Sequence, residues 1–364
     1  MFFLLLFFQK KTVFLHPMKR DEIVLAFKKL SLVLQCYDIQ CDTYCDEMLT
    51  HFHHAVIKAM SANVWFTQND VAFALNQIVN MLKIDDVYLL FDNLNMNKLN
   101  IPKKVAILLD DETPFSNFTE FFAILMSGNT FVGKLHDNDQ FLLPALSELL
   151  ISIDSRFAEK IFFTNTHLAN FDSIILSSLS DSDHIYDKYW SKYTHILKKK
   201  KKSIAIIKGD ESSDDLDKLS SDIFTYFGKG NRSVSKIYIP HGYDINTLIN
   251  SFTKYEYLKH HSRYFNNYEY NKSICLINKI PHYDNGFVIL KESDDVISAI
   301  SVLHYQEYFS VEELCKDIGN KRAEIETICC KDAFFDGSVV FGSSQSLTFR
   351  RFYSDLMSIN ELLS

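Results

Sequence analysis

The chain has 364 residues, enough for one large or two medium domains with a substantial core. Hydrophobic residues make up 47% of the sequence and the net charge is −8, which excludes a broad nucleic-acid-binding surface. Seven scattered cysteines favour a reducing compartment over a disulfide framework, so we expect a cytoplasmic protein.

The first apolar run, residues 1–8, is too short to span a bilayer and lacks the basic and small-residue flanks of a signal peptide. We expect residues 1–17 to be a non-native or disordered extension, with Met18 as the natural start. A tail that touches a membrane is the alternative interpretation. No other segment qualifies as an integral membrane span.

Residues 18–83 have helical periodicity, and Thr67 with Asp70 forms a capping signal for the last of these helices. From about Lys103, short strands and helices alternate, which predicts a doubly wound parallel sheet. Helices are predicted at 118–126 and 142–153, and strands at 105–109, 130–135, 160–163 and 172–176.

Five consecutive lysines, 198–202, read as a solvated surface stretch or, alternatively, as a patch that faces phosphate or CoA. A domain boundary is expected here. The predicted parts are a helical start with a cofactor-type domain (18–204), a catalytic-type domain (205–332) and a C-terminal return segment (333–364). Strands of the second part are predicted at 203–207, 237–239, 273–278, 287–290 and 300–305.

A glycine loop, 228–233, precedes the strand that stops at Pro240. Two glycines two residues apart let the backbone between them approach a ligand closely, a place where proteins often present a reactive side chain. The residue presented here is Asn231, whose neutral, delocalised amide is not a nucleophile.

The order of features from Ser203 to Ile239 resembles the aldehyde dehydrogenase superfamily around its nucleophile. Within it, segments 222–228 and 234–244 are most similar to the bacterial long-chain acyl-CoA (acyl-protein) reductases of luminescence operons, and further landmarks cover most of the chain from Met18 on. The resemblance implies an α/β fold with a doubly wound, Rossmann-type cofactor domain and an α/β catalytic-type domain. It also implies NADPH-dependent reduction of a fatty acyl-CoA or acylated protein to an aldehyde, through a cysteine thioester.

The chain departs from the chemical pattern that this resemblance implies. Asn231 stands at the position of the nucleophilic cysteine, and Glu112 stands at the position of the asparagine that stabilises the oxyanion. A carboxylate there would repel the developing negative charge. Ser233 lies two residues after Asn231, but a serine ester is much harder to reduce than a thioester.

At the position of the family's cofactor-phosphate turn, the stretch 176–179 has no glycine, and Ser178 places a Cβ where close backbone approach is needed. Lys134 and Glu292 match residues that the resemblance assigns to the cofactor ribose and the nicotinamide ribose. We therefore expect NADPH to be the cofactor by resemblance, with its phosphate contacts impaired.

Our interpretation is a catalytically degenerate member of that family. The alternatives are an altered activity and an ordinary reductase activity by an unseen route. A further alternative, from another class, is a non-catalytic protein that binds acyl groups or CoA, or that is the partner subunit of an active paralogue. Both a homo-oligomer and a hetero-complex stay open. The Cys/His-rich stretch 36–54 does not match zinc-site spacing, so no metal is expected.

Overall fold

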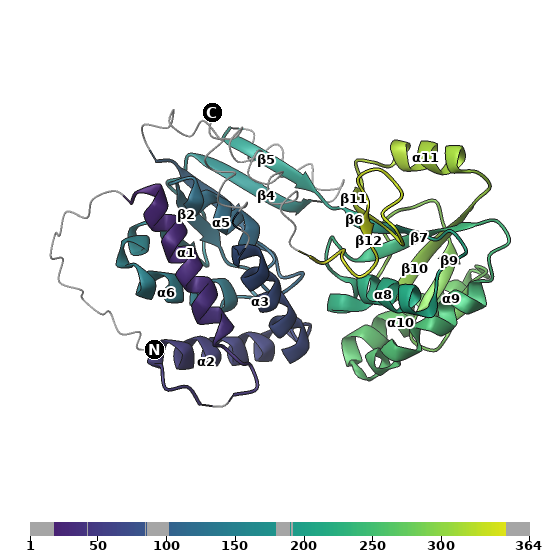
Figure 1. Cartoon of the computed structure of the whole chain (residues 1–364), viewed down its shortest axis with the longest axis horizontal. Coiled ribbons are helices and arrows are strands. Elements are labelled where there is room, and N and C mark those ends of the chain that lie inside the picture. The colour runs from purple at the N-terminus through teal and green to yellow at the C-terminus, as the bar shows by residue number, and fades with distance from the viewer. Residues whose placement is uncertain are drawn as a thin grey trace.

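The computed structural model describes residues 18–41, 43–83, 85, 102–179, 190 and 192–346, and the predicted 1–17 extension lies outside them. Two mainly parallel β-sheets lie side by side along the long axis of the molecule, each with its own helices (Figure 1). No helix in these ranges is long and apolar enough to cross a membrane. The predicted α/β class is confirmed.

The first sheet is entirely parallel, with strand order β3-β2-β1-β4-β5. Its strands are β1 (Lys104–Leu108), β2 (Thr130–Lys134), β3 (Ile161–Thr164), β4 (Ser173–Leu179) and β5 (Thr194–Lys199). The apolar run that forms β1 is buried on both faces, because Val105 and Ile107 pack into the helical core while Ala106 packs on the opposite side.

The helices of this half gather against one face of the sheet (Figure 1). They are α1 (Arg20–Gln35), α2 (Glu47–Ala62), α3 (Gln68–Lys83), α5 (Phe118–Met126), α6 (Leu142–Ile153) and the short 3-10 helix η2 (Ser155–Glu159). Every residue of α5 is buried, and Phe122 meets Phe27 of α1 edge to face at 4.6 Å. The predicted bounds of α5 and α6 are confirmed.

The second sheet has seven strands in the order β12-β11-β6-β7-β10-β9-β8, and β8 is antiparallel to β9. The strands are β6 (Lys202–Ile206), β7 (Val234–Pro240), β8 (Tyr283–Asp284), β9 (Ile289–Glu292), β10 (Val302–Tyr308), β11 (Ile325–Cys330) and β12 (Val339–Val340). Its helices are α8 (Ser213–Phe224), η3 (Thr225–Gly228), α9 (Ile245–Ser251), η4 (Phe252–His260), α10 (Ser262–Ile277) and α11 (Val311–Asn320).

Side chains of the inner strand β6 alternate between two cores, as the period of a strand requires. Ala205 packs with α8 and α9, whereas Ile204 and Ile206 pack with α11. Both faces of the sheet are therefore covered, and the ends of its strands are left to build a site.

One sequence prediction in this half is wrong. Residues 273–278 were expected to form a strand but belong almost entirely to α10, which His261 caps by accepting from the Tyr264 amide. The lysine run, interpreted as a solvated stretch or as a phosphate-facing patch, enters β5 and β6, and its last residue, Lys202, is only 4% exposed. The chain leaves the first sheet after Lys199 and joins the second at Lys202, so the predicted boundary after residue 204 falls within β6.

Candidate functional site

The glycine loop lies at the amino ends of β6 and β7, between the two halves of the molecule. Tyr226, Phe227 and Gly228 have left-handed φ angles of 56°, 58° and 72°, which reverse the chain after α8. For each of the two aromatic residues this backbone costs ~1–2 kcal/mol. The surroundings must offset that cost.

Aromatic contacts from both halves hold this left-handed turn. The Phe227 ring lies 5.3 Å from the ring of Trp65, which precedes α3, and 4.4 Å from His261, which precedes α10. Tyr226 meets Phe73 of α3 at 5.8 Å. The His261 Nε2 atom lies 2.8 Å from the carbonyl oxygen of Val64, so the same histidine links the two halves directly. Aromatic side chains from both halves therefore pack around the turn.

Lys202 fixes the next part of the loop. Its Nζ donates hydrogen bonds to three successive carbonyl oxygens, those of Gly228, Lys229 and Gly230, at 2.6, 2.8 and 2.9 Å. Burial lowers the pKa of Lys202 to about 7, and the negative charge of Glu112 acts in the opposite direction.

The loop after β1, residues 109–117, packs directly on the glycine loop. A Cβ added to Gly230 would lie 2.9 Å from Cγ2 of Thr113. Glu112 is mostly buried and pairs with Lys200 at 3.4 Å, and its negative charge, together with burial, raises the pKa of Asp110 to about 6. The predicted oxyanion position is thus brought beside the nucleophile position, but as a carboxylate that faces lysines.

Asn231 is half-buried at the tip of the loop, and its Oδ1 atom is buried without a hydrogen-bond partner among the described residues. Ser233 is fully buried; its hydroxyl lies 3.4 Å from the Thr225 carbonyl and accepts from Nε2 of Gln345 at 3.2 Å. A buried hydroxyl with both partners is poorly placed to attack a substrate.

The C-terminal return segment, as far as residue 346, closes over this loop. The buried Asp222 carboxylate accepts from the amides of Gly342 and Ser344 at 2.7 and 2.9 Å. Arg232 donates to the carbonyl of Gln345 at 3.1 Å. Residues 347–364 of the predicted segment lie outside the described residues.

The three residues predicted to bind the cofactor lie on three different strands. Lys134 ends β2 and is half-buried, whereas Glu292 ends β9 and is exposed. Ser178 was expected in a turn, but the backbone of β4 continues through it to Leu179, alongside β5. The stretch is strand because β5 supplies hydrogen bonds across an irregularity in their pairing. The side chain of Ser178 is outside the described part.

None of the seven cysteines belongs to the glycine loop or to the loop after β1. Cys329 and Cys330 are buried near the carboxyl end of β11, opposite the end that carries the loop, and burial raises the pKa of the Cys329 thiol. The remaining cysteines are Cys36, Cys41 and Cys45 in the first half, Cys275 on α10 and Cys315 on α11. In the described ranges no group of three His, Cys, Asp or Glu side chains could hold a metal.

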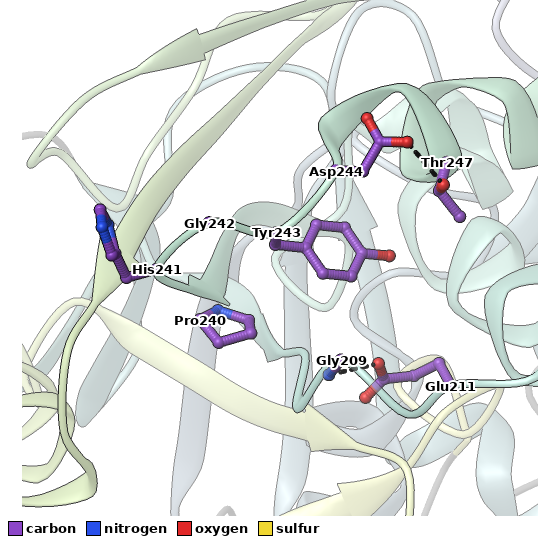
Figure 2. A pocket seen from close by; sticks show the side chains of 8 residues that line it. All are labelled: Gly209, Glu211, Pro240, His241, Gly242, Tyr243, Asp244 and Thr247. Atoms are coloured by element: carbon purple, nitrogen blue, oxygen red, sulfur yellow. Dashed lines mark hydrogen bonds between the residues drawn. The ribbon is translucent and has the colours of Figure 1, made fainter.

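A pocket of about 400 Å³ opens at the carboxyl ends of β6 and β7, the opposite edge from the loop. Both of its carboxylates already accept hydrogen bonds from other groups of the protein, as Figure 2 shows. Glu211 accepts from the amides of Lys208 and Gly209, at 2.7 and 2.9 Å, and Asp244 caps α9. Burial raises the pKa of the Tyr243 phenol in this pocket to about 12. The pocket offers no free charged group for chemistry.

Sequence reasoning missed three residues that shape the site. Lys202 was hidden in a charge run, Thr113 is an unremarkable neighbour of Glu112, and Trp65 lies just before the predicted capping signal at Thr67. The first two act on backbone atoms or on a glycine, which leave no pattern in a sequence. Trp65 belongs to one of the landmarks that extend the family resemblance beyond the glycine loop, and that resemblance is the signal that could have found it.

No family model matches the chain, and no curated protein is found to be similar in sequence. Solved structures, however, share the fold. The chain matches a substrate-bound aldehyde dehydrogenase of Staphylococcus aureus with a TM-score of 0.54 and 14% identity, covering 86% of this chain and 76% of that one.

Two further solved structures match the chain to a similar degree. The aldehyde dehydrogenase of Bacillus cereus, solved with NAD+, gives a TM-score of 0.58 at 13% identity over 93% of this chain and 74% of that one. Aldehyde dehydrogenase 21 of Physcomitrella patens, solved with succinate, gives 0.55 at 11% identity over 90% and 84%. At these identities the comparison establishes the architecture, and the chain has an aldehyde-dehydrogenase-like fold.

Proposed function

We propose that this chain is a catalytically silent relative of the long-chain acyl-CoA reductases. The observation that carries the proposal is Asn231 at the tip of the loop between the two halves, where thioester chemistry needs a thiolate. The fold supports the position of the loop, and the sequence landmarks support the family.

The surroundings of Asn231 support a silent site rather than a rebuilt one. Glu112 faces Lys200 instead of offering a hydrogen-bond donor to an oxyanion. The single hydroxyl of the glycine loop, on Ser233, is buried and already hydrogen-bonded. None of these groups supplies a nucleophile or a proton relay.

The residues present do not fit the phosphates of NADPH. The stretch expected to be the phosphate turn is strand at Ser178, and the acidic loop 110–112 follows β1, where the phosphates would approach. We propose that the chain does not hold NADPH at ordinary coenzyme concentrations. Fluorescence titration with NADPH tests this, and saturable binding would contradict it.

As a non-catalytic cytoplasmic protein, the chain would bind a fatty acyl-CoA or an acylated protein without turnover, or would pair with an active reductase subunit. Both roles follow from the proposed family. Neither requires the missing thiolate.

The deciding experiment incubates the purified protein with palmitoyl-CoA and NADPH, and measures intact mass and released aldehyde. We expect neither an acyl adduct nor aldehyde from the wild type. The Asn231→Cys variant should also release no aldehyde, because Glu112 and the altered phosphate position remain. An adduct with NADPH-dependent aldehyde release from the wild type would overturn the proposal. Aldehyde from Asn231→Cys alone would show that the other two changes are harmless.

A further inference from the structure

The buried ammonium of Lys202 has an unusual set of partners. All three of its hydrogen bonds end on backbone carbonyl oxygens of consecutive residues, 228–230, and no carboxylate is bonded to it among the described residues. An ammonium has three N–H groups, so the set is complete. A neutral amine has two and would leave one carbonyl facing a lone pair.

Consecutive carbonyls do not meet at one atom in regular structure, because in a strand they alternate sides and in a helix they point along the axis. Here the backbone changes hand between Gly228, with φ 72°, and Lys229, with φ −73°. The three oxygens converge on a single point from 2.6 to 2.9 Å, which is the geometry of a small-cation site.

We propose that the carbonyl oxygens of residues 228–230 form a small-cation site that the Lys202 ammonium fills, and that Lys202 is thereby the positioning residue of the loop that carries Asn231. The inference concerns the shape of the loop and does not depend on whether any chemistry occurs there. It assigns a role to a residue that lies 26 to 28 positions away from its partners in sequence.

The charges around the site agree with this role. Glu112 contributes a favourable negative charge, whereas Lys200 and Lys229 contribute unfavourable positive ones. The Lys229 ammonium is directed elsewhere, over the ring of Trp65 at 4.9 Å. Lys202 is therefore the cation that reaches the carbonyls, and its neighbours in the lysine run do not replace it.

Chemical rescue tests the proposal at pH 6.5, below the pKa of about 7, where most of the amine is protonated. Lys202→Ala removes the ammonium and leaves room for a small cation, whereas Lys202→Met removes the charge but fills the space. We expect both variants to unfold at a lower temperature than the wild type. Ammonium, methylammonium or potassium chloride should raise the Tm of Lys202→Ala by ~2–4 °C over choline chloride at equal ionic strength, with saturation.

The same salts should leave Lys202→Met and the wild type unchanged relative to choline. Lys200→Ala is the matched control, because it removes a neighbouring lysine that pairs with Glu112 and does not reach the carbonyls. Hydrogen exchange at the amides of residues 228–231 should rise in Lys202→Ala and fall again with ammonium. Equal stabilisation of both Lys202 variants, or no response of Lys202→Ala, would overturn the proposal. If Lys202→Ala does not fold, the test is hydrogen exchange at the amides of residues 228–231 in Lys202→Met, and exchange equal to that of the wild type would overturn the proposal.

Discussion

Replacing Gly230 by alanine tests whether the glycine loop and the loop after β1 touch as the structure shows. The new Cβ would lie 2.9 Å from Cγ2 of Thr113, well inside the 3.4 Å at which ordinary contacts begin. Gly230 does not have a left-handed φ, so the backbone accepts alanine without strain. Overpacking of this kind costs ~1–3 kcal/mol, and the lower entropy of the unfolded alanine chain returns ~0.4–1 kcal/mol.

The expected result is a net loss of up to ~2.6 kcal/mol, or a fall in Tm of up to ~10 °C. Urea unfolding of Gly230→Ala, Thr113→Ser and the double variant measures it as a double-mutant cycle. Thr113→Ser removes only the methyl group that clashes, so the double variant should be no less stable than Thr113→Ser alone.

Gly319→Ala in α11 is the control, because nothing lies within 4 Å of its added Cβ and its φ is not left-handed. It should stabilise the protein by ~0.5–1 kcal/mol. If Gly230→Ala behaves like Gly319→Ala, or if Thr113→Ser gives no relief, the two loops are not in contact and the site is not assembled as described.

Three further changes probe the supports of the site and of the first half. Burial raises the pKa of Asp139 to about 6, so the contribution of its protonated carboxyl to stability is present below pH 4 and is lost as the pH rises through 6. In urea unfolding, the free energy of unfolding of Asp139→Asn should therefore exceed that of the wild type by ~1–3 kcal/mol at pH 7.5 but not at pH 4. At Phe227, with φ 58°, the glycine variant should be more stable than the alanine variant by ~1 kcal/mol. An alanine variant as stable as the glycine variant, or more stable, would contradict the left-handed backbone. Asp222→Ala leaves the amides of Gly342 and Ser344 unpaired, so the protein should lose ~2–4 kcal/mol and hydrogen exchange at residues 341–346 should rise; unchanged exchange would contradict the docking.

The sequence predicted the first half well because its signals are local. The helix α5 is apolar at seven of its nine positions, and α6 has an apolar face at helical spacing, so both were located to the residue. The capping signal at Thr67 is also confirmed, since Asp70 and Thr67 bond to each other's backbone amides.

The wrong strand at 273–278 shows where such signals fail. Its apolar stretch includes Leu276 and Ile277, which are 60% and 79% exposed at the end of α10, whereas Cys275 is buried. A short apolar run is compatible with a strand or a helix, and the helix that contains this one begins after its cap at His261, twelve residues before the stretch.

The glycine loop could be predicted from the sequence as a candidate site, but the contacts that build it could not. The loop and Asn231 were found because glycine spacing and family landmarks mark them. The left-handed turn at Tyr226 and Phe227 was not found, because aromatic residues rarely adopt it and only tertiary contacts impose it.

The contacts that hold the glycine loop do not depend on the identity of the residue at its tip. Lys202 binds backbone carbonyls, Thr113 packs on Gly230, and Trp65 packs on Phe227, so these supports do not contact the side chain of residue 231 through any described bond. Asn231 itself is half-buried, and its buried Oδ1 has no hydrogen-bond partner among the described residues, so it adds no hydrogen bond that would hold the loop. The shape of the loop is therefore set by contacts that do not involve the side chain at its tip, and the proposed loss of a thiolate at this position is compatible with an intact scaffold.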